Sequence, residues 1–249
     1  MSSFHKAIAL LALIADSPTP PRFTDLLSAS GRPKATLHRL LGALASEGLI
    51  TLDEPTQTYR PGLRLLELAH RSWLSLDLRS IAAADVDRLT EQTGETVHLA
   101  VLDGSQIVYI DKRESGNSLR LFSAIGKRGP LYCTGVGKAI LAALAPAALD
   151  TLLATTELAG HTPTTITDDT VLRTELAAVR ERGCAYDIEE HEQGIRCVAA
   201  AIVEASGRIV GGLSVTAPTV RMTGDRMEAL GPLVIDAADR IAEKHVLLH

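Results

Sequence analysis

The sequence predicts an α+β protein with a helical N-terminal part and a mixed C-terminal part. Helical periodicity dominates residues 1–50. Alternating polar and apolar residues, typical of β-strands, are concentrated around residues 96–112 and 184–218, with helix-like segments between them. Strands gathered at both ends of a region, with helices between, indicate an α+β domain on an antiparallel sheet.

The composition is that of an ordinary globular protein, with 46% hydrophobic residues and a net charge of −5. The apolar stretch near the N-terminus is too short to cross a bilayer and lacks the features of a signal peptide. The three cysteines form no C-x-x-C pair, so neither a disulfide framework nor a zinc site is indicated. We therefore expect a cytoplasmic protein that carries no metal or other cofactor and does not contact a membrane.

The charges are distributed unevenly along the chain. Residues 1–70 carry seven Lys and Arg against six Asp and Glu, whereas residues 71–249 carry eighteen against twenty-four. No acidic residue occurs between Asp25 and Glu47. A basic face on an acidic chain is typical of a nucleic-acid-binding module joined to another domain, although a solvated helix face gives the same pattern.

The first 46 residues predict three helices. Residues 4–15 are apolar on nearly all sides, which predicts a helix that buries more than one face or packs against a partner chain. A short second helix ends at Gly31, and Pro33 suits the first position of the third helix. Leucines of the third helix recur at helical spacing and form one buried stripe, namely Leu37, Leu40, Leu41 and Leu44.

The exposed face of the third helix carries hydrogen-bond donors near its N-terminus. A short helix, a glycine turn and such a second helix form a helix-turn-helix pattern, in which the second helix enters the major groove of DNA. Residues 48–62 then predict two short strands around an acidic turn, the wing of a winged helix. A purely structural three-helix unit would show the same helices. The residues expected to contact DNA are Arg32, Lys34, Thr36, His38 and Arg39, with Arg60 on the wing.

A helical stretch leads away from the wing without a Gly/Ser-rich linker. Its apolar residues recur at helical spacing over about residues 62–78, which predicts a rigid connecting helix. We accordingly expect a DNA-binding domain over residues 1–70 and a second domain over residues 71–249.

The stretch Gly135-Val136-Gly137-Lys138 resembles a phosphate-binding loop at first sight. Its spacing is not that of G-x-x-x-x-G-K-[ST], and Ala139 takes the place of the required Ser or Thr, so nucleotide hydrolysis is not expected. A glycine turn at a helix start still offers free N–H groups to an anion such as a carboxylate, although close packing alone explains glycines equally well. Lys138 is expected to face solvent.

Catalysis by a cysteine nucleophile is not favoured by the sequence. All three cysteines border or lie in apolar strands, where cysteine usually acts as a small inert hydrophobe. His161 and His191 are candidates to activate a thiol, but nothing in the sequence brings either close to one. Strand alternation places Ser214 and Thr216 on one face, where two hydroxyls line either a pocket or an exposed surface.

Several ordered motifs together carry a family resemblance. They are PKATLHRLLGALASEGLI, YRPGLRLLEL, GKRGPLYCTGVGKAIL, ELAAVRERGCAYDIEEHEQGIRCVAAAI and GRIVGGLSVTAPTVRMT. With these motifs the chain resembles the IclR family of bacterial transcription regulators over nearly its whole length. The resemblance implies a winged helix-turn-helix joined by a helix to a GAF-like α/β effector-binding domain. It also implies a homodimer or homotetramer that binds palindromic double-stranded operator DNA and is not an enzyme.

The resemblance further implies which residues bind an effector. The carboxylate of a small acid would be held by the backbone amides of Gly135 and Val136. The other polar contacts would come from Asp187, Cys197, Ser214 and Thr216, the last of which replaces the commoner serine. DNA binding would then be controlled by a small organic acid, such as a sugar acid or a keto acid, that shifts the population of two quaternary arrangements.

Two other classes of function stay open from the sequence. A small-molecule enzyme or carrier would use the N-terminal helices only for dimerisation. A metal-dependent sensor would use Cys197 together with a nearby histidine.

Overall fold

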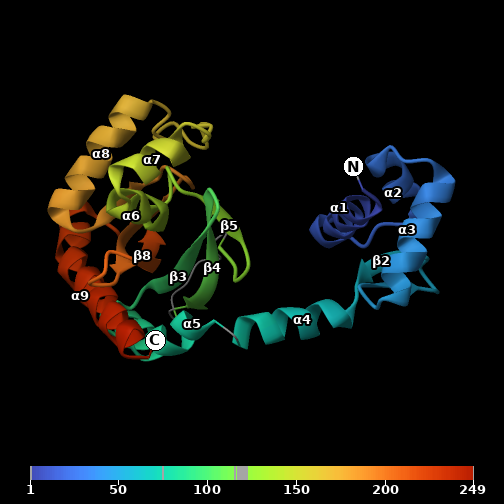
Figure 1. Ribbon diagram of the computed structural model, residues 1–249, viewed down its shortest axis with the longest axis horizontal. Coiled ribbons are helices and arrows are strands. Elements are labelled where there is room, and N and C mark those ends of the chain that lie inside the picture. The colour runs from blue at the N-terminus through green and yellow to red at the C-terminus, as the bar shows by residue number, and fades with distance from the viewer. Residues whose placement is uncertain (1, 75, 115, 117–122, 249) are drawn as a thin grey trace. The chain divides into compact units, whose positions relative to one another are not determined.

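The computed structural model shows two compact units in the chain, Met1–Leu76 and Asp77–His249 (Figure 1). The structure describes residues 2–74, 76–114, 116 and 123–248. Each unit encloses its own cluster of buried apolar side chains. The two clusters are the cores on which the two candidate functional surfaces are built.

The N-terminal unit packs three helices beside a two-stranded hairpin, followed by a fourth helix. Its elements are α1 (Ser3–Asp16), α2 (Phe23–Ser30), α3 (Lys34–Ser46), β1 (Ile50–Asp53), β2 (Thr58–Pro61) and α4 (Leu63–Leu74). All four leucines of the predicted stripe on α3 are at most 3% exposed and pack against Leu10 and Ile14 of α1. The antiparallel pairing of β1 with β2 confirms the predicted wing.

Helix α1 buries only one face within the chain. Leu10 and Ile14 are buried, whereas Phe4 and Ile8 are 72% and 45% exposed. The prediction that this helix buries more than one face is therefore wrong for the single chain, because its neighbours α2, α3 and β2 do not surround it. The alternative prediction, packing against a partner chain, stays open.

The connecting helix is shorter than the sequence predicts. A continuous helix was expected over about residues 62–78, but α4 ends at Leu74 and the next helix begins at Asp77. Residue 75 lies outside the described residues. The N–H of Leu76 bonds the carbonyl of Trp73 over 3.2 Å, just beyond the end of α4.

The C-terminal unit is a six-stranded sheet in which every neighbouring pair is antiparallel, in the order β5-β4-β3-β8-β7-β6. Its strands are β3 (Thr96–Asp103), β4 (Gln106–Arg113), β5 (Arg128–Pro130), β6 (Ala185–Ile188), β7 (Ile195–Val203) and β8 (Ile209–Pro218). Its helices are α5 (Asp77–Thr93), α6 (Gly135–Ala143), α7 (Pro146–Leu153), α8 (Asp169–Arg182) and α9 (Gly224–Leu248). This arrangement confirms the predicted α+β class.

Helices cover both faces of this sheet (Figure 1). Two consecutive glycines of β8 demonstrate this packing on both faces, because successive strand residues point to opposite faces of a sheet. A Cβ on Gly211 would lie 2.8 Å from Leu78 of α5, and one on Gly212 would lie 3.0 Å from Val136 of α6. Helices α5 and α9 therefore pack on one face, while α6 packs on the other and contacts α8.

Candidate functional site

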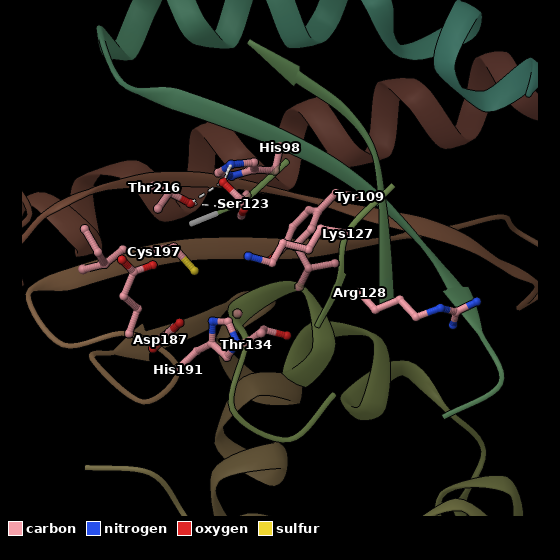
Figure 2. A pocket seen from close by; sticks show the side chains of 15 residues that line it. His98, Tyr109, Ser123, Lys127, Arg128, Thr134, Asp187, His191, Cys197 and Thr216 are labelled. Atoms are coloured by element: carbon pink, nitrogen blue, oxygen red, sulfur yellow. Dashed lines mark hydrogen bonds between the residues drawn. The ribbon is translucent and has the colours of Figure 1, made fainter. Parts of the chain in front are cut away.

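A pocket lies between the N-terminal end of α6 and the sheet of the C-terminal unit (Figure 2). Its cavity has a volume of about 50 Å³. The six residues that the sequence nominated for effector binding all line it, although they come from α6 and three different strands: Gly135, Val136, Asp187, Cys197, Ser214 and Thr216. The structure thus brings these six together, and their role in binding stays a prediction.

The start of α6 supplies hydrogen-bond donors to this pocket. The Thr134 hydroxyl caps the helix by accepting from the N–H of Gly137 over 3.2 Å, and it donates to the carbonyl of Pro130 over 2.6 Å. The backbone of Gly135 hydrogen-bonds the sulfur of Cys197. Within the described residues the N–H of Val136 has no acceptor. A helix start with a free N–H in a pocket favours an anion.

Gly135 is also required by packing. A Cβ at this position would lie 2.4 Å from the Cys197 sulfur and 3.2 Å from the Cβ of Ala199. The helix can approach β7 this closely only because residue 135 has no side chain. Close packing of α6 on β7 by itself therefore explains this glycine.

Asp187 is a buried carboxyl at the same end of the pocket. Its Oδ1 accepts from the N–H of Glu190 over 2.8 Å. Burial raises the pKa of Asp187 to about 7, although the Glu190 amide and the charge of Lys138 act in the opposite direction. Near neutral pH this side chain is partly protonated, so it both donates to and accepts from a ligand.

The turn after Asp187 is held in place by threonine hydroxyls. Glu189 adopts a left-handed backbone with φ of 61°. Its carbonyl accepts from the Thr162 hydroxyl over 2.6 Å, and the Glu190 carbonyl accepts from the Thr165 hydroxyl over 2.6 Å. These bonds offset the cost of the unusual backbone and fix the amide that bonds Asp187.

Lys138 does not face solvent, contrary to the sequence expectation. Its side chain is 1% exposed, its Nζ forms an ion pair with Glu190, and it lies 3.6 Å from Glu175. The reason is that α6 is covered both by the sheet and by α8, so no side of its first turns reaches water. A buried cation then needs an internal carboxylate.

His98 of β3 is a pocket residue that sequence reasoning missed. Its Nδ1 lies 3.2 Å from the Thr216 hydroxyl, and its Nε2 lies 2.7 Å from the Ser123 hydroxyl. Burial lowers the pKa of His98 to about 3, so the imidazole is neutral. A polar residue inside the apolar strand TVHLAVL was the available signal, and its register partner on β8 is Ser214. Tyr109, Lys127, Thr134 and His191 also line the pocket and were not nominated as ligands.

The cysteines are not placed for nucleophilic chemistry. Burial raises the pKa of the thiols of Cys133 and Cys197, which therefore stay protonated at neutral pH. Among the described residues, no group of three or more His, Cys, Asp and Glu side chains is placed to hold a metal ion. No helix in the described part of the chain is long and apolar enough to cross a membrane.

The residues nominated for DNA contact all lie in the N-terminal unit. Lys34 begins α3 and is exposed, as is Arg39 five residues later. The His38 ring stacks on that of Phe23, with 4.2 Å between the ring centroids, and Arg60 on β2 is exposed. The remaining two, which are half-buried, are Arg32 and Thr36. The structure presents these side chains on a helix-turn-helix, and their contact with DNA stays a prediction.

Comparison with known proteins bears on both units. The family model described as "Bacterial transcriptional regulator IclR C-terminal" matches residues 70–243, and the "IclR helix-turn-helix domain" model matches residues 3–54. The transcriptional regulator XynR of Escherichia coli K12 is 36% identical over 222 residues, which cover 89% of this chain and 88% of XynR. The regulator KdgR of the same organism is 34% identical over 219 residues, covering 88% of this chain and 83% of KdgR.

A solved structure agrees with these sequence matches. The crystal structure of Thermotoga maritima IclR has a TM-score of 0.81 and 31% identity, and it covers 97% of this chain and 98% of its own. These relatives are regulators and not enzymes, so the alternative of an enzyme or carrier finds no support in them. The chain belongs to the IclR family of bacterial transcriptional regulators, which combine a helix-turn-helix domain with an effector-binding domain.

Proposed function

We propose that this protein binds double-stranded operator DNA through residues 1–70 and that a small organic acid, bound within residues 71–249, controls this binding. The observation that carries the proposal is one buried pocket in which a helix start with a free N–H meets Asp187 and the hydroxyls of Ser214 and Thr216. The effector would bind one quaternary arrangement better than another and so shift the spacing of two recognition helices.

The donors and acceptors of the pocket suit an acid that carries further oxygen atoms. The Val136 N–H and the α6 dipole favour a carboxylate. Asp187, partly protonated near neutral pH, tolerates that charge beside it, and the two hydroxyls, 3.4 Å apart, match hydroxyl or keto oxygens. These features support a hydroxylated, sugar or keto acid as the effector.

We further infer that the active form is a homodimer or homotetramer. Helix α4 has no buried residue, and its leucines at 63, 66 and 74 are all exposed. Together with Phe4 and Ile8 of α1 they leave apolar surface that a second copy of the chain would cover. Two copies related by a twofold axis would present two recognition helices to a palindromic operator.

Two classes of variant test the division of labour. Arg39→Ala or Lys34→Ala is expected to weaken binding to the DNA upstream of the protein's own gene and to lower the salt slope by about one phosphate contact. Asp187→Ala or Ser214→Ala is expected to weaken effector binding and to leave DNA affinity without effector unchanged. Fluorescence anisotropy at several salt concentrations and a thermal-shift screen of sugar, keto and aromatic acids measure the two activities.

A surface arginine of the C-terminal unit provides the matched control. Arg208 is 60% exposed and lies outside both candidate surfaces, so Arg208→Ala should change neither activity. If the two classes of variant shared one phenotype without unfolding, the assignment of DNA and effector to separate domains would be wrong.

A further inference from the structure

We propose that His98 determines effector specificity. Through the hydrogen-bonded chain Ser123–His98–Thr216–Ser214, it recognises a hydroxyl or carbonyl oxygen at the end of a short-chain acid remote from the carboxylate. The inference rests on the proposed function, because it assumes that the pocket holds an organic acid. It adds the class of effector and a residue that selects it.

The four side chains form a continuous polar wall. His98 is 3% exposed and uses both ring nitrogens, at 3.2 Å from Thr216 Oγ1 and 2.7 Å from Ser123 Oγ. Thr216 Oγ1 in turn lies 3.4 Å from Ser214 Oγ. All four residues line the pocket, so a ligand there touches the chain rather than an isolated hydroxyl.

The protons of this hydrogen-bonded chain can be arranged to suit either a carbonyl or a hydroxyl of the ligand. A neutral imidazole has one N–H and one lone pair, so one of its two hydroxyl partners accepts from the ring and the other donates to it. With the proton on Nδ1, Thr216 accepts from the ring, and its own O–H is free to donate to a ligand carbonyl. With the proton on Nε2, Thr216 donates to the ring and keeps a lone pair for a ligand hydroxyl.

An apolar ligand group at this place satisfies neither arrangement. A methyl or methylene group offers no donor or acceptor to Thr216 and Ser214, while it excludes the water that would otherwise bond them. Sites built to bond a ligand oxygen reject the analogue that lacks it for this reason. The hydrogen-bonded chain therefore discriminates between acids of equal carbon-chain length by whether they carry an oxygen at the end remote from the carboxylate.

The positions of the polar groups set which end of the effector reaches His98. Figure 2 shows His98, Ser123 and Thr216 at one end of the pocket, and Asp187 with Thr134 at the start of α6 at the other. A carboxylate held at the α6 start leaves the opposite end of the molecule facing His98. The cavity of about 50 Å³ is small, which favours a short aliphatic acid at this place.

Matched pairs of acids test this assignment in the full chain. Isothermal titration compares 4-hydroxybutanoate with butanoate, and 4-oxopentanoate with pentanoate. The unmodified protein should prefer the oxygen-bearing member of at least one pair by about tenfold or more. His98→Phe should reduce that preference to less than about threefold by weakening only the oxygen-bearing acid. His98→Asn, which can still bond Thr216, should keep most of it.

The same titrations separate failure of this inference from failure of the proposed function. Equal weakening of both members of a pair by His98→Phe, or no change in either, would overturn the specificity role. Absence of binding for all four acids would overturn the short-acid class, and the proposed function would fail only if the broader screen of sugar, keto and aromatic acids also found no ligand. If His98→Phe does not fold, Ser123→Ala tests the same chain, and an equal effect on both acids would again refute it.

Discussion

Removal of the buried cation of α6 is expected to destabilise the C-terminal unit strongly. Lys138→Met keeps much of the side-chain volume but leaves Glu190 buried without its counterion. The Oε2 atom of Glu190 already lacks a hydrogen-bond partner in the described structure, so the carboxylate has little else to stabilise its charge. The variant therefore tests whether this lysine is a structural ion rather than a surface residue.

The two ion pairs of Lys138 contribute unequally. Breaking the buried pair with Glu190 is expected to cost about 3–5 kcal/mol. The pair with Glu175 adds at most about 1 kcal/mol, because Glu175 is partly exposed and keeps a second partner, Arg182, at 3.4 Å. The summed loss of about 3–6 kcal/mol is a large part of the roughly 5–15 kcal/mol that stabilises a typical domain.

The loss should depend on pH with a defined sign. Burial already raises the pKa of Glu190, and removal of Lys138 raises it further. The unfolded chain releases this proton at about pH 4.3, whereas the folded variant keeps it to a higher pH. The stability of the variant therefore falls as the pH rises from about 4.3 to the raised pKa of Glu190. The deficit relative to the unmodified protein is therefore smaller at pH 5 than at pH 8.

Urea unfolding followed by circular dichroism measures the effect, and hydrogen exchange of the α6 amides assigns the transition to the C-terminal unit. Arg208→Met, which removes a 60% exposed arginine from its pair with Glu204, should cost much less than Lys138→Met. Lys138→Met combined with Glu190→Leu should recover most of the loss, because no buried charge remains. A loss below about 1 kcal/mol at pH 8 for Lys138→Met, or a double variant as unstable as the single one, would refute the reasoning.

Three further predictions concern the pocket. Because the pKa of Asp187 is raised to about 7, an anionic effector should bind more tightly at pH 6 than at pH 8 in calorimetric titrations. Asp187→Asn should flatten this pH dependence, and an affinity that rises with pH would contradict the prediction. Gly135→Ala places a methyl group 2.4 Å from the Cys197 sulfur and should lower the free energy of unfolding in urea by about 1–3 kcal/mol. Adding Cys197→Ala should restore part of this loss, and equal stability of the single and double variants would argue against the clash. Thr165→Val removes a donor to the turn that positions Asp187 and should weaken effector binding several-fold, whereas Thr165→Ser and the helix-surface variant Thr174→Val should not.

The elements of this protein were largely predictable because their signals are local. The leucine stripe of α3 follows from helical spacing alone, and the shared face of Ser214 and Thr216 follows from strand alternation. The end of the connecting helix was not predictable to the residue. Helical spacing continues to Leu76 in the sequence, whereas α4 ends at Leu74.

The sequence by itself determined the fold class and the helix-turn-helix, and its family resemblance named six of the residues that line the pocket, Asp187 among them. Only the tertiary structure decided that Lys138 is buried and that His98 joins Thr216 and Ser123. Both decisions depend on what packs beside a residue from a distant part of the chain: Glu190 lies 52 residues from Lys138, and Thr216 lies 118 residues from His98. Periodicity reports which face a side chain occupies, whereas burial, charge pairing and protonation are set by the neighbours that folding brings to that face.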